Sequence, residues 1–377
     1  MKQLLYMKTI IYLSVIIIIL SSCTSGVKGI FAKKTDREKY AEKIEKLNPL
    51  KGKSWKNAGE LALLNPLITA VPYSETGSLH GDSADVAAFR FPVKAGQKII
   101  VELSALTKPF TAYTELWEIR NNGERKLLSS ADTLLNFIEH SSPEAGNYLV
   151  RMQPQLGTTG SFKFSIILSP LLGYPIEPGI KSNIGSIWGA DRDAGVRKHE
   201  GIDIFAKKGS YIVAVTDGTV SRLGDGGIGG KVIWFSPADY NFSVYYAHLD
   251  TQLVQSGQRV KKGDFLGTVG NTGNARFTPA HLHFGIYTGY GAIDPLAFIQ
   301  EIRSPKESIL SDKLNQWYKG SAKLKLYPSP EKKNAYSLNE SINMKLQSYT
   351  ADFYRVIFPD GKRAFVSDDD INKKMKL

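Results

Sequence analysis

The amino-acid sequence predicts an all-β protein built from successive β-rich units. Two observations support this fold class: apolar and polar residues alternate with a period of two in many short segments, and turn residues separate those segments. The chain has 377 residues and is 42% hydrophobic, which suits two to three folded domains. The units expected in order are an N-terminal β-sandwich, a central β-rich domain, for which the resemblance described below implies a groove across one sheet, and a small C-terminal barrel.

Residues 1–22 are expected to form a lipoprotein signal peptide. Met1 to Lys8 is short and basic, and the apolar run from Thr9 to Leu20 is about half the ~20 residues that a membrane-spanning helix needs. The segment Leu20-Ser21-Ser22-Cys23 resembles a bacterial lipobox, which implies cleavage before Cys23 and attachment of lipid to that cysteine. An ordinary signal peptide is the alternative. Cys23 is the only cysteine, so the chain has no intramolecular disulfide.

Residues 23–58 are expected to contain a linker and a short helix. Thr35 and Glu38 have the spacing of a capping box, and Tyr40, Ile44 and Leu47 share one helical face. We expect this helix to pack on the domain that follows and to carry no chemistry.

Residues 59–170 are predicted to form the β-sandwich. Phe89, Phe91 and Val93 alternate with polar residues, and the run from Phe162 to Leu168 does the same. The turns Ala95-Gly96-Gln97 and Ala145-Gly146-Asn147-Tyr148 resemble those of the jelly-roll modules that accompany secreted peptidases. His80 and His140 lie here without ligand spacing, and we expect both to be surface or half-buried residues.

The remaining boundaries follow from turn and alternation signals. Residues 171–178 are rich in proline and glycine and indicate a linker before the central domain at 179–300. Residues 301–314 are expected to be a short helical connector. Residues 320–377 alternate again around a Pro359-Asp360-Gly361 turn and look like a bacterial SH3-like module. Such modules bind wall peptides or serve as structural caps.

Histidines cluster in the central domain, which contains four of the six in the chain. His281 and His283 precede a strand-like run, and residues two apart on a strand point to the same face. Two imidazoles placed in this way suit a metal site or a catalytic pair.

The segment His199-Glu200-Gly201-Ile202-Asp203 offers two further ligands. An extended chain would separate the Cα atoms of His199 and Asp203 by roughly 13 Å, which makes joint ligation of one zinc ion difficult. We therefore expect a bend near Gly201, with Asp203 entering the next strand. Glu200 is the competing carboxylate, but its parity directs it away from Asp203. Two imidazoles and one carboxylate suit zinc and leave a fourth position for water.

Two weaker signals need interpretation. His248 lies within Tyr245-Tyr246-Ala247-His248-Leu249, where a single histidine is more often a core residue than a functional one. Gly224, Gly226 and Gly229 match G-x-G-x-x-G but lead into a strand, whereas a dinucleotide site needs a following helix. We therefore interpret these glycines as a hairpin turn beside the groove.

Together, His199-x-x-x-Asp203, Tyr246-Ala247-His248-Leu249 and His281-Leu282-His283-Phe284 resemble the lysostaphin/LytM-type zinc endopeptidases, the M23 metallopeptidase family. The resemblance covers about residues 183–300. It implies that His199, Asp203 and His283 bind one Zn²⁺ and that His248 and His281 are catalytic histidines that do not bind the metal. The loop from Ala275 to Pro279 is slightly longer than expected for the family.

The resemblance also implies a mechanism and a substrate. One of His248 and His281 would accept a proton from water and the other would donate a hydrogen bond to the oxyanion, with His281 the preferred base. An exported lipoprotein of this family would hydrolyse peptide cross-links or stems of peptidoglycan in the bacterial cell envelope, at D-Ala–diaminopimelate bonds or within glycine bridges. Expected partners are peptidoglycan and, through Cys23, a membrane, with no obligate protein partner.

Other functions are weighed against this one. A non-catalytic peptidoglycan-binding regulator that activates another wall hydrolase is the main alternative, and a zinc peptidase acting on elastin-like or glycine-rich proteins is the third. The net charge of +12 is explained first by lysine-rich solvated faces that keep the protein soluble, and the alternative is an anionic partner such as wall polymer or phospholipid. Nucleic acid is not expected, because basic residues do not alternate with aromatic residues in a stripe.

Overall fold

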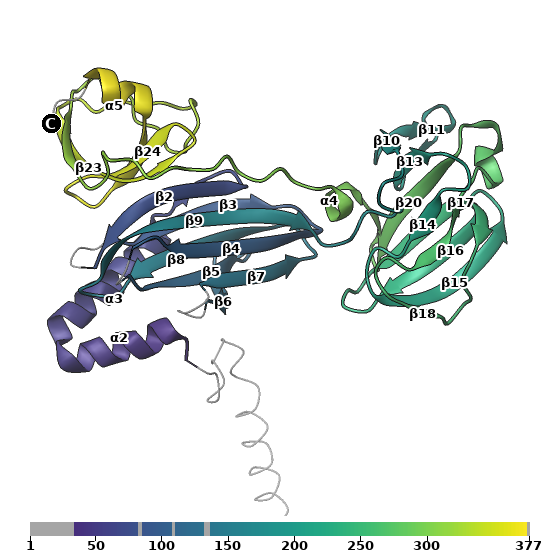
Figure 1. Cartoon of the computed structure of the whole chain (residues 1–377), viewed down its shortest axis with the longest axis horizontal. Coiled ribbons are helices and arrows are strands. Elements are labelled where there is room, and N and C mark those ends of the chain that lie inside the picture. Colours follow the sequence, from purple (N-terminus) through teal and green to yellow (C-terminus); the bar gives the residue numbers. More distant parts are fainter. Residues whose placement is uncertain (1–33, 82–84, 108–109, 132–135, 375–377) are drawn as a thin grey trace, which may run out of the picture.

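The computed structural model describes residues 34–81, 85–107, 110–131 and 136–374 (Figure 1). The all-β fold class is confirmed, since three multistranded sheets contain most of the regular secondary structure of the described residues and almost all of their strand pairs are antiparallel. The expected signal peptide and Cys23 lie outside the described residues. Within the described part of the chain, no helix is long and apolar enough to cross a membrane.

Two helices precede the sandwich, α2 (Asp36–Leu47) and α3 (Pro49–Leu64). The predicted capping box is present, because Glu38 N–H donates to Thr35 Oγ1 at 3.1 Å and Thr35 N–H donates to Glu38 Oε2 at 2.9 Å. The sequence analysis did not predict α3, where it expected a linker and then the start of the sandwich. The buried face of α3 includes Gly52 and Gly59, and glycines conceal the apolar period that marks a helix.

Two sheets pack face to face to form the sandwich, with aromatic residues such as Phe89 and Phe164 stacked between them at a ring distance of 5.3 Å. The first sheet has the order β1 (Leu67–Ile68), β3 (Ala87–Val93), β8 (Gly146–Pro154), β5 (Ala112–Ile119) and β6 (Arg125–Ser130). The second sheet begins with β7 (Phe137–Ser142), β4 (Gln97–Ala105), β9 (Thr159–Pro170) and β2 (Tyr73–His80).

The C-terminal strands continue the second sheet of the sandwich. They are β23 (Ile342–Thr350), β24 (Phe353–Ile357) and β25 (Arg363–Ser367), with β22 (Trp317–Gly320) beside β23 and the helix α5 (Asp368–Lys374) at the end. β23 pairs with β2 through Thr76–Tyr349 and Gly77–Ser348. A Cβ at Gly77 would lie 2.6 Å from Ser348 Cβ, so glycine permits this approach. Among the described residues, strand pairing does not close the C-terminal strands into a barrel, and the SH3-like likeness stays a prediction.

The connector between the central domain and the C-terminal strands is extended rather than helical, and it runs beside β2. Thr76 Oγ1 donates to Ser308 O at 2.8 Å, and Ser74 Oγ donates to Lys306 O at 2.8 Å. These contacts pair backbone carbonyls of the connector with side chains of β2, whereas in a helix the same carbonyls would pair with backbone N–H groups of the connector itself.

The central domain is built on one ten-stranded sheet with its own apolar core. The main path is β10 (Ser182–Ser186), β13 (Ile202–Ala206), β20 (His281–Thr288), β17 (Ser243–Gln252), β16 (Gly230–Pro237), β15 (Gly218–Gly226) and β18 (Arg259–Val260). Further pieces are the strands β14 (Tyr211–Val213), β19 (Phe265–Val269) and β21 (Gly291–Ile293), the hairpin of β11 (Asp191–Arg192) and β12 (Arg197–Lys198), the short helical turns η1 (Asp193–Gly195) and η2 (Gly273–Phe277), and α4 (Leu296–Ile299).

The central domain adjoins one end of the sandwich, and the C-terminal strands lie at the other end (Figure 1). At the junction, Leu172 N–H donates to Phe298 O at 2.8 Å, and the Phe298 ring packs against Gly96 in the turn before β4. The domain thus joins the sandwich through α4 and the segment after β9.

Candidate metal centre

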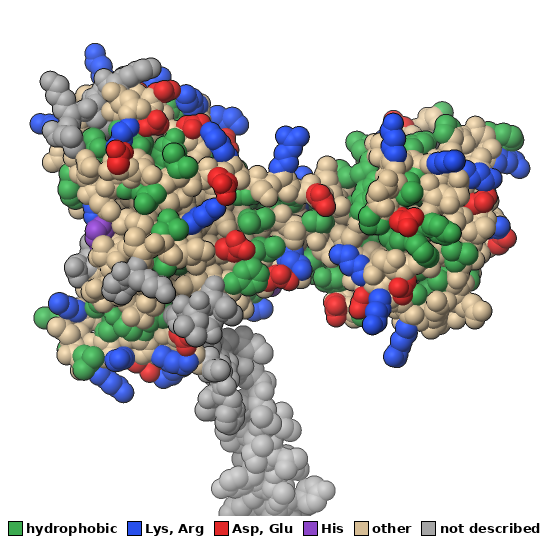
Figure 2. Space-filling model, viewed as in Figure 1, with side chains coloured by type: hydrophobic (Ala, Val, Ile, Leu, Met, Phe, Trp, Pro, Cys, Tyr) green, Lys and Arg blue, Asp and Glu red, His purple; other side chains and the backbone are tan. Residues whose placement is uncertain are grey.

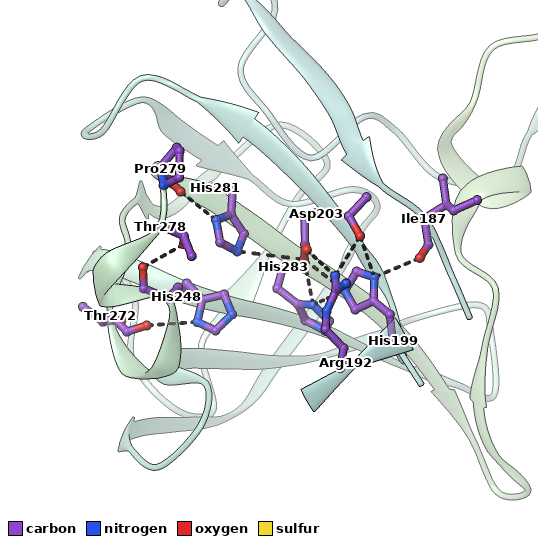
Figure 3. Close-up of polar contacts among 12 residues, drawn as sticks. Ile187, Arg192, His199, Asp203, His248, Thr272, Thr278, Pro279, His281 and His283 are labelled. Carbon is purple, nitrogen blue, oxygen red and sulfur yellow. Dashed lines mark hydrogen bonds and ion pairs between the residues drawn. The ribbon is translucent and has the colours of Figure 1, made fainter. Parts of the chain in front are cut away.

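Four histidines and one aspartate line a groove of about 590 Å³ on the central sheet. The groove lies over β13, β20 and β17, and loops around η2 and the β11–β12 hairpin border it. In Figure 3, Asp203 and His283 lie between His199 and Arg192 on one side and His248 and His281 on the other. A groove of this size accommodates an extended peptide or a small ligand.

Asp203 and His283 meet because they are direct cross-strand partners on β13 and β20. His281 lines the same groove, whereas Leu282 between them is fully buried on the opposite side, as the period of two predicts.

The predicted bend near Gly201 is also present and brings His199 to the same point. A Cβ at Gly201 would lie 2.7 Å from the His283 ring, so this approach requires glycine.

Three potential ligand atoms converge at this point. His199 Nε2 lies 2.9 Å from His283 Nδ1, and Asp203 Oδ1 lies 3.0 Å from the former and 3.1 Å from the latter. Zinc bonds of about 2 Å in tetrahedral geometry place neighbouring ligand atoms roughly 3.3 Å apart. Within the described residues, this is the group whose arrangement could hold a metal ion.

The surrounding contacts favour a metal over a simple hydrogen-bonded cluster. His199 Nδ1 lies 3.0 Å from Ile187 O, so its proton is directed to that carbonyl and the lone pair of Nε2 faces the cluster. The second carboxylate oxygen of Asp203 accepts from Arg192 Nη2 at 2.7 Å, and the same nitrogen donates to Ser186 Oγ at 2.7 Å. Arg192 therefore directs the other oxygen of Asp203 toward the imidazoles.

The electrostatics of the cluster keep Asp203 ionised and favour a neutral His283. Burial alone would raise the pKa of Asp203, but hydrogen bonds from His199 and His283 and their charge lower it well below the usual range. Burial lowers the pKa of His283, against the opposing effect of Asp203. A carboxylate and neutral imidazoles are the forms that bind metal.

His281 and His248 share one arrangement beside the cluster. His281 Nδ1 lies 2.8 Å from Pro279 O, and His248 Nδ1 lies 3.0 Å from Thr272 O. Because each Nδ1–H is directed to a carbonyl, each Nε2 remains available in the groove. His281 Nε2 is 4.0 Å from Asp203 Oδ1, and the His248 and His281 rings are 5.0 Å apart.

His248 is a groove residue rather than a core histidine of the kind its surrounding sequence suggests. Its backbone φ is 62°, an uncommon conformation for a residue other than glycine, and this bend directs the side chain into the groove. Burial, followed by the charges of His281 and His283, lowers its pKa to about 4. The ring therefore stays neutral near pH 7 and can accept a proton.

The sequence analysis missed Arg192 and the aromatic residues of the groove. Arg192 lies on β11, before the His199 motif, in a segment with no periodic pattern. Tyr245 packs edge-on against His283 at a ring distance of 6.0 Å, and Phe205 lies 5.0 Å from the His281 ring. Alternation places Phe205 on the same face of its strand as Asp203, and this signal could have identified it.

Comparisons with known proteins agree with the position of this site. The family described as Peptidase family M23 matches residues 197–295. The murein hydrolase activator NlpD of Salmonella dublin is 33% identical over 130 residues, which are 34% of this chain and 31% of that protein. The L-Ala–D-Glu endopeptidase of Bacillus subtilis is 35% identical over 126 residues, 31% of this chain and 38% of that protein.

A solved structure of LytU is 37% identical and covers 31% of this chain and 84% of that one, with a TM-score of 0.29. The chain spans about a fifth to a third of the length of the first curated relatives it matches, 21% of one and 31% of another. The shared part is the domain that carries the groove. Residues 197–295 thus match peptidase family M23, and this segment contains all five groove residues named above.

Proposed function

We propose that the protein is a zinc-dependent endopeptidase that hydrolyses peptide bonds in peptidoglycan cross-links or stems. The convergence of His199 Nε2, Asp203 Oδ1 and His283 Nδ1, with two further histidines in the same groove, carries this proposal. An intact set of ligands and proton-transfer groups serves hydrolysis, whereas a surface that only binds peptide has no need of it.

His199, Asp203 and His283 would hold one zinc ion and leave its fourth position open. Bound there, zinc would polarise the scissile carbonyl and lower the pKa of water toward neutrality. Arg192 supports the site by holding the second oxygen of Asp203.

His248 and His281 would handle the protons. One accepts the proton of the attacking water at Nε2 and passes it to the leaving amine, and the other contacts the oxyanion. Both rings are anchored by a carbonyl at Nδ1, which fixes their orientation in the groove. His281, which lies nearer the Asp203 carboxylate, is our choice for the base.

Substrate and location are inferred together. Two relatives named above are a murein hydrolase activator and an endopeptidase named for an L-Ala–D-Glu bond. The net charge of +12 suits an anionic wall or lipid surface. We therefore place the protein in the bacterial cell envelope, anchored by lipid at Cys23, with peptidoglycan as its partner.

The likeness to a murein hydrolase activator supports a second candidate function. In that case the groove would bind wall peptide or another hydrolase without cleavage. The two candidates differ in one measurable respect, because only the enzyme creates new peptide termini.

The deciding experiment is digestion of purified peptidoglycan by zinc-loaded protein, with fragments identified by mass spectrometry. We expect new termini that depend on zinc and disappear with His281→Ala, while that variant still binds zinc. The matched control is His140→Ala, which removes a half-buried histidine of the sandwich, outside the groove. An absence of cleavage by zinc-loaded wild-type protein, with activation of a separate hydrolase, would favour the activator.

A further inference from the structure

Helix α3 carries apolar side chains on two opposite sides, and the sandwich covers only one of them. Trp55, Gly59 and Ala62 face the sandwich and are buried. On the outer side, Leu50 is 83% exposed and Leu64 is 63% exposed. Exposed apolar surface that extends along one side of a helix marks an interaction site, so this outer side points to a partner.

The exposed residues form a continuous stripe. Leu50, Ser54, Asn57, Leu61 and Leu64 are separated by three or four residues, so their side chains lie along one helical face, with the two small polar residues between the leucines. Leu50, Ala58 and Leu61 also line a shallow depression on this face. Leu47 at the end of α2 is 75% exposed and extends the stripe around the turn between the helices.

Unpaired basic residues flank the stripe. Other lysines of the two helices form ion pairs, such as Lys39 with Asp36 and Lys56 with Glu45. Four exposed lysines near the turn form no ion pair within the described part of the chain: Lys43, Lys46, Lys51 and Lys53. Figure 2 shows basic and hydrophobic side chains interspersed on this lower lobe of the molecule.

We propose that the hairpin of α2 and α3 binds the surface of an anionic phospholipid bilayer. Leu47, Leu50, Leu61 and Leu64 enter the boundary between headgroups and acyl chains, and the four lysines contact lipid phosphates. Helices with this division of leucine and lysine lie in the interfacial plane of membranes. The aliphatic stem of a lysine can cover apolar surface while its ammonium group stays among the headgroups, which suits the same arrangement.

A lipid bilayer fits this surface better than a wall polymer does. Leucine side chains gain from an apolar phase, which glycan strands and short polar peptides do not provide. The sequence before the hairpin also contains an apolar run from Thr9 to Leu20 and the lone Cys23. Only ten residues lie between Cys23 and Lys34, a span of at most about 40 Å when extended, so both regions can reach one membrane.

The hairpin and the groove domain lie in different parts of the molecule, so membrane binding by one does not cover the other. The hairpin lies below the sandwich, and the groove domain lies beyond the far end of the sandwich (Figure 1). A membrane under the hairpin therefore leaves the groove accessible. The inference rests on the hairpin surface and requires neither peptidase activity nor lipid on Cys23.

The test uses the full chain with Cys23→Ser and a single new cysteine, Leu50→Cys, which carries a polarity-sensitive fluorophore. The matched control carries the same label at Ile309→Cys, a position 72% exposed on the connector. With vesicles containing phosphatidylglycerol, we expect the emission from position 50 to shift to shorter wavelength while the emission from position 309 stays unchanged. Vesicles of phosphatidylcholine alone should produce a smaller shift.

A charge-reversal variant separates the basic residues from the leucines. Lys46→Glu/Lys51→Glu/Lys53→Glu should reduce vesicle binding roughly 10-fold or more, since each lysine near an anionic surface contributes measurably. The control is Lys319→Glu/Lys323→Glu/Lys325→Glu, which reverses three exposed charges on β22 and the loop that follows it. Equal losses in both variants would indicate a general charge effect and overturn the proposal.

Two further outcomes would overturn it. Vesicle-bound protein with the label at position 50 still in water would show that another region makes the contact. A wavelength shift that grows with protein concentration without vesicles would indicate a second copy of the chain as the partner. Peptidoglycan digestion by the same labelled protein without vesicles tests the proposed enzyme separately.

Discussion

The groove and the junction between β2 and β23 both bury charged side chains, but the hydrogen-bond partners of those side chains differ between the two regions. At the junction, Arg355 and Glu75 are fully buried and form a bidentate pair at 3.0 Å. Glu75 also accepts from Tyr73 Oη at 2.8 Å and Ser348 Oγ at 2.6 Å, and Arg355 donates to Gln347 Oε1 at 2.6 Å. Within this network, donors and acceptors pair with one another.

In the groove, acceptor atoms converge instead. His199 Nε2, His283 Nδ1 and Asp203 Oδ1 lie within 3.1 Å of one another, and Arg192 contacts only the other oxygen of Asp203. Burial alone would lower the pKa of Arg355, but the charge of Glu75 raises it, so the pair needs no further ion to balance its charges. The comparison teaches that a buried cluster whose imidazole and carboxylate atoms converge at the spacing of zinc ligands suits a cation, whereas a cluster of matched donors and acceptors stabilises the fold.

The largest expected effect is loss of zinc binding in Asp203→Ala. Zinc sites bind with roughly 10–16 kcal/mol, so one of three protein ligands carries on the order of 4 kcal/mol, or about 1000-fold in affinity. Titration against a chromogenic chelator measures this directly. Zinc should raise the unfolding midpoint of the wild-type protein but not of the variant. Full zinc occupancy in Asp203→Ala would contradict the ligand assignment.

Glu75→Gln should produce the reverse pattern, with lost stability and unchanged zinc affinity. Leaving Arg355 buried without its counter-charge is expected to cost about 3–5 kcal/mol in the free energy of unfolding, measured with urea. The control is Glu307→Gln, which removes the exposed Lys163–Glu307 pair and should cost at most about 1 kcal/mol. Similar losses in the two variants would mean that the junction does not depend on this pair.

The same contrast explains what the sequence could predict. Asp203 and His283 belong to short local motifs on strands, where the period of two and one glycine determine the side-chain directions, and the family resemblance of those motifs implied that they share one site. The Glu75–Arg355 pair joins residues 280 positions apart, and no local pattern encodes which strands will pair. Arg192 lies in an irregular segment, and α3 conceals its apolar period behind buried glycines. Local periodicity therefore predicted side-chain directions, and the family resemblance supplied the grouping of the ligands. The irregular segment of Arg192 and the long-range pairing of β2 with β23 gave no such signal.

Arg192→Ala tests whether the groove depends on a contact outside the three ligand atoms. Arg192 orients Asp203 through one hydrogen bond of 2.7 Å, and loss of such a partner typically weakens metal affinity roughly 10–100-fold. Arg192→Lys should recover part of the affinity, because a lysine can still donate one hydrogen bond. If zinc affinity in Arg192→Ala equals that of the wild-type protein, Ser186 and the imidazoles orient Asp203 without it.

The smallest expected effect is a pH dependence that the groove has and the junction lacks. In the folded, metal-free protein burial lowers the pKa of His248 from 6.5 to about 4, so between these values the unfolded chain binds more protons than the folded one. Stability should therefore fall as the pH decreases through that window, and His248→Gln should remove part of the dependence. Urea unfolding in the presence of a chelator at pH 7.5 and pH 5 measures it for both proteins.

Glu75→Gln is the control, because its stability loss should be nearly the same at both pH values. Equal pH dependence in wild-type and His248→Gln protein would contradict this prediction. It would mean that the pKa of His248 is the same in the folded and unfolded protein and that the groove does not keep the ring neutral.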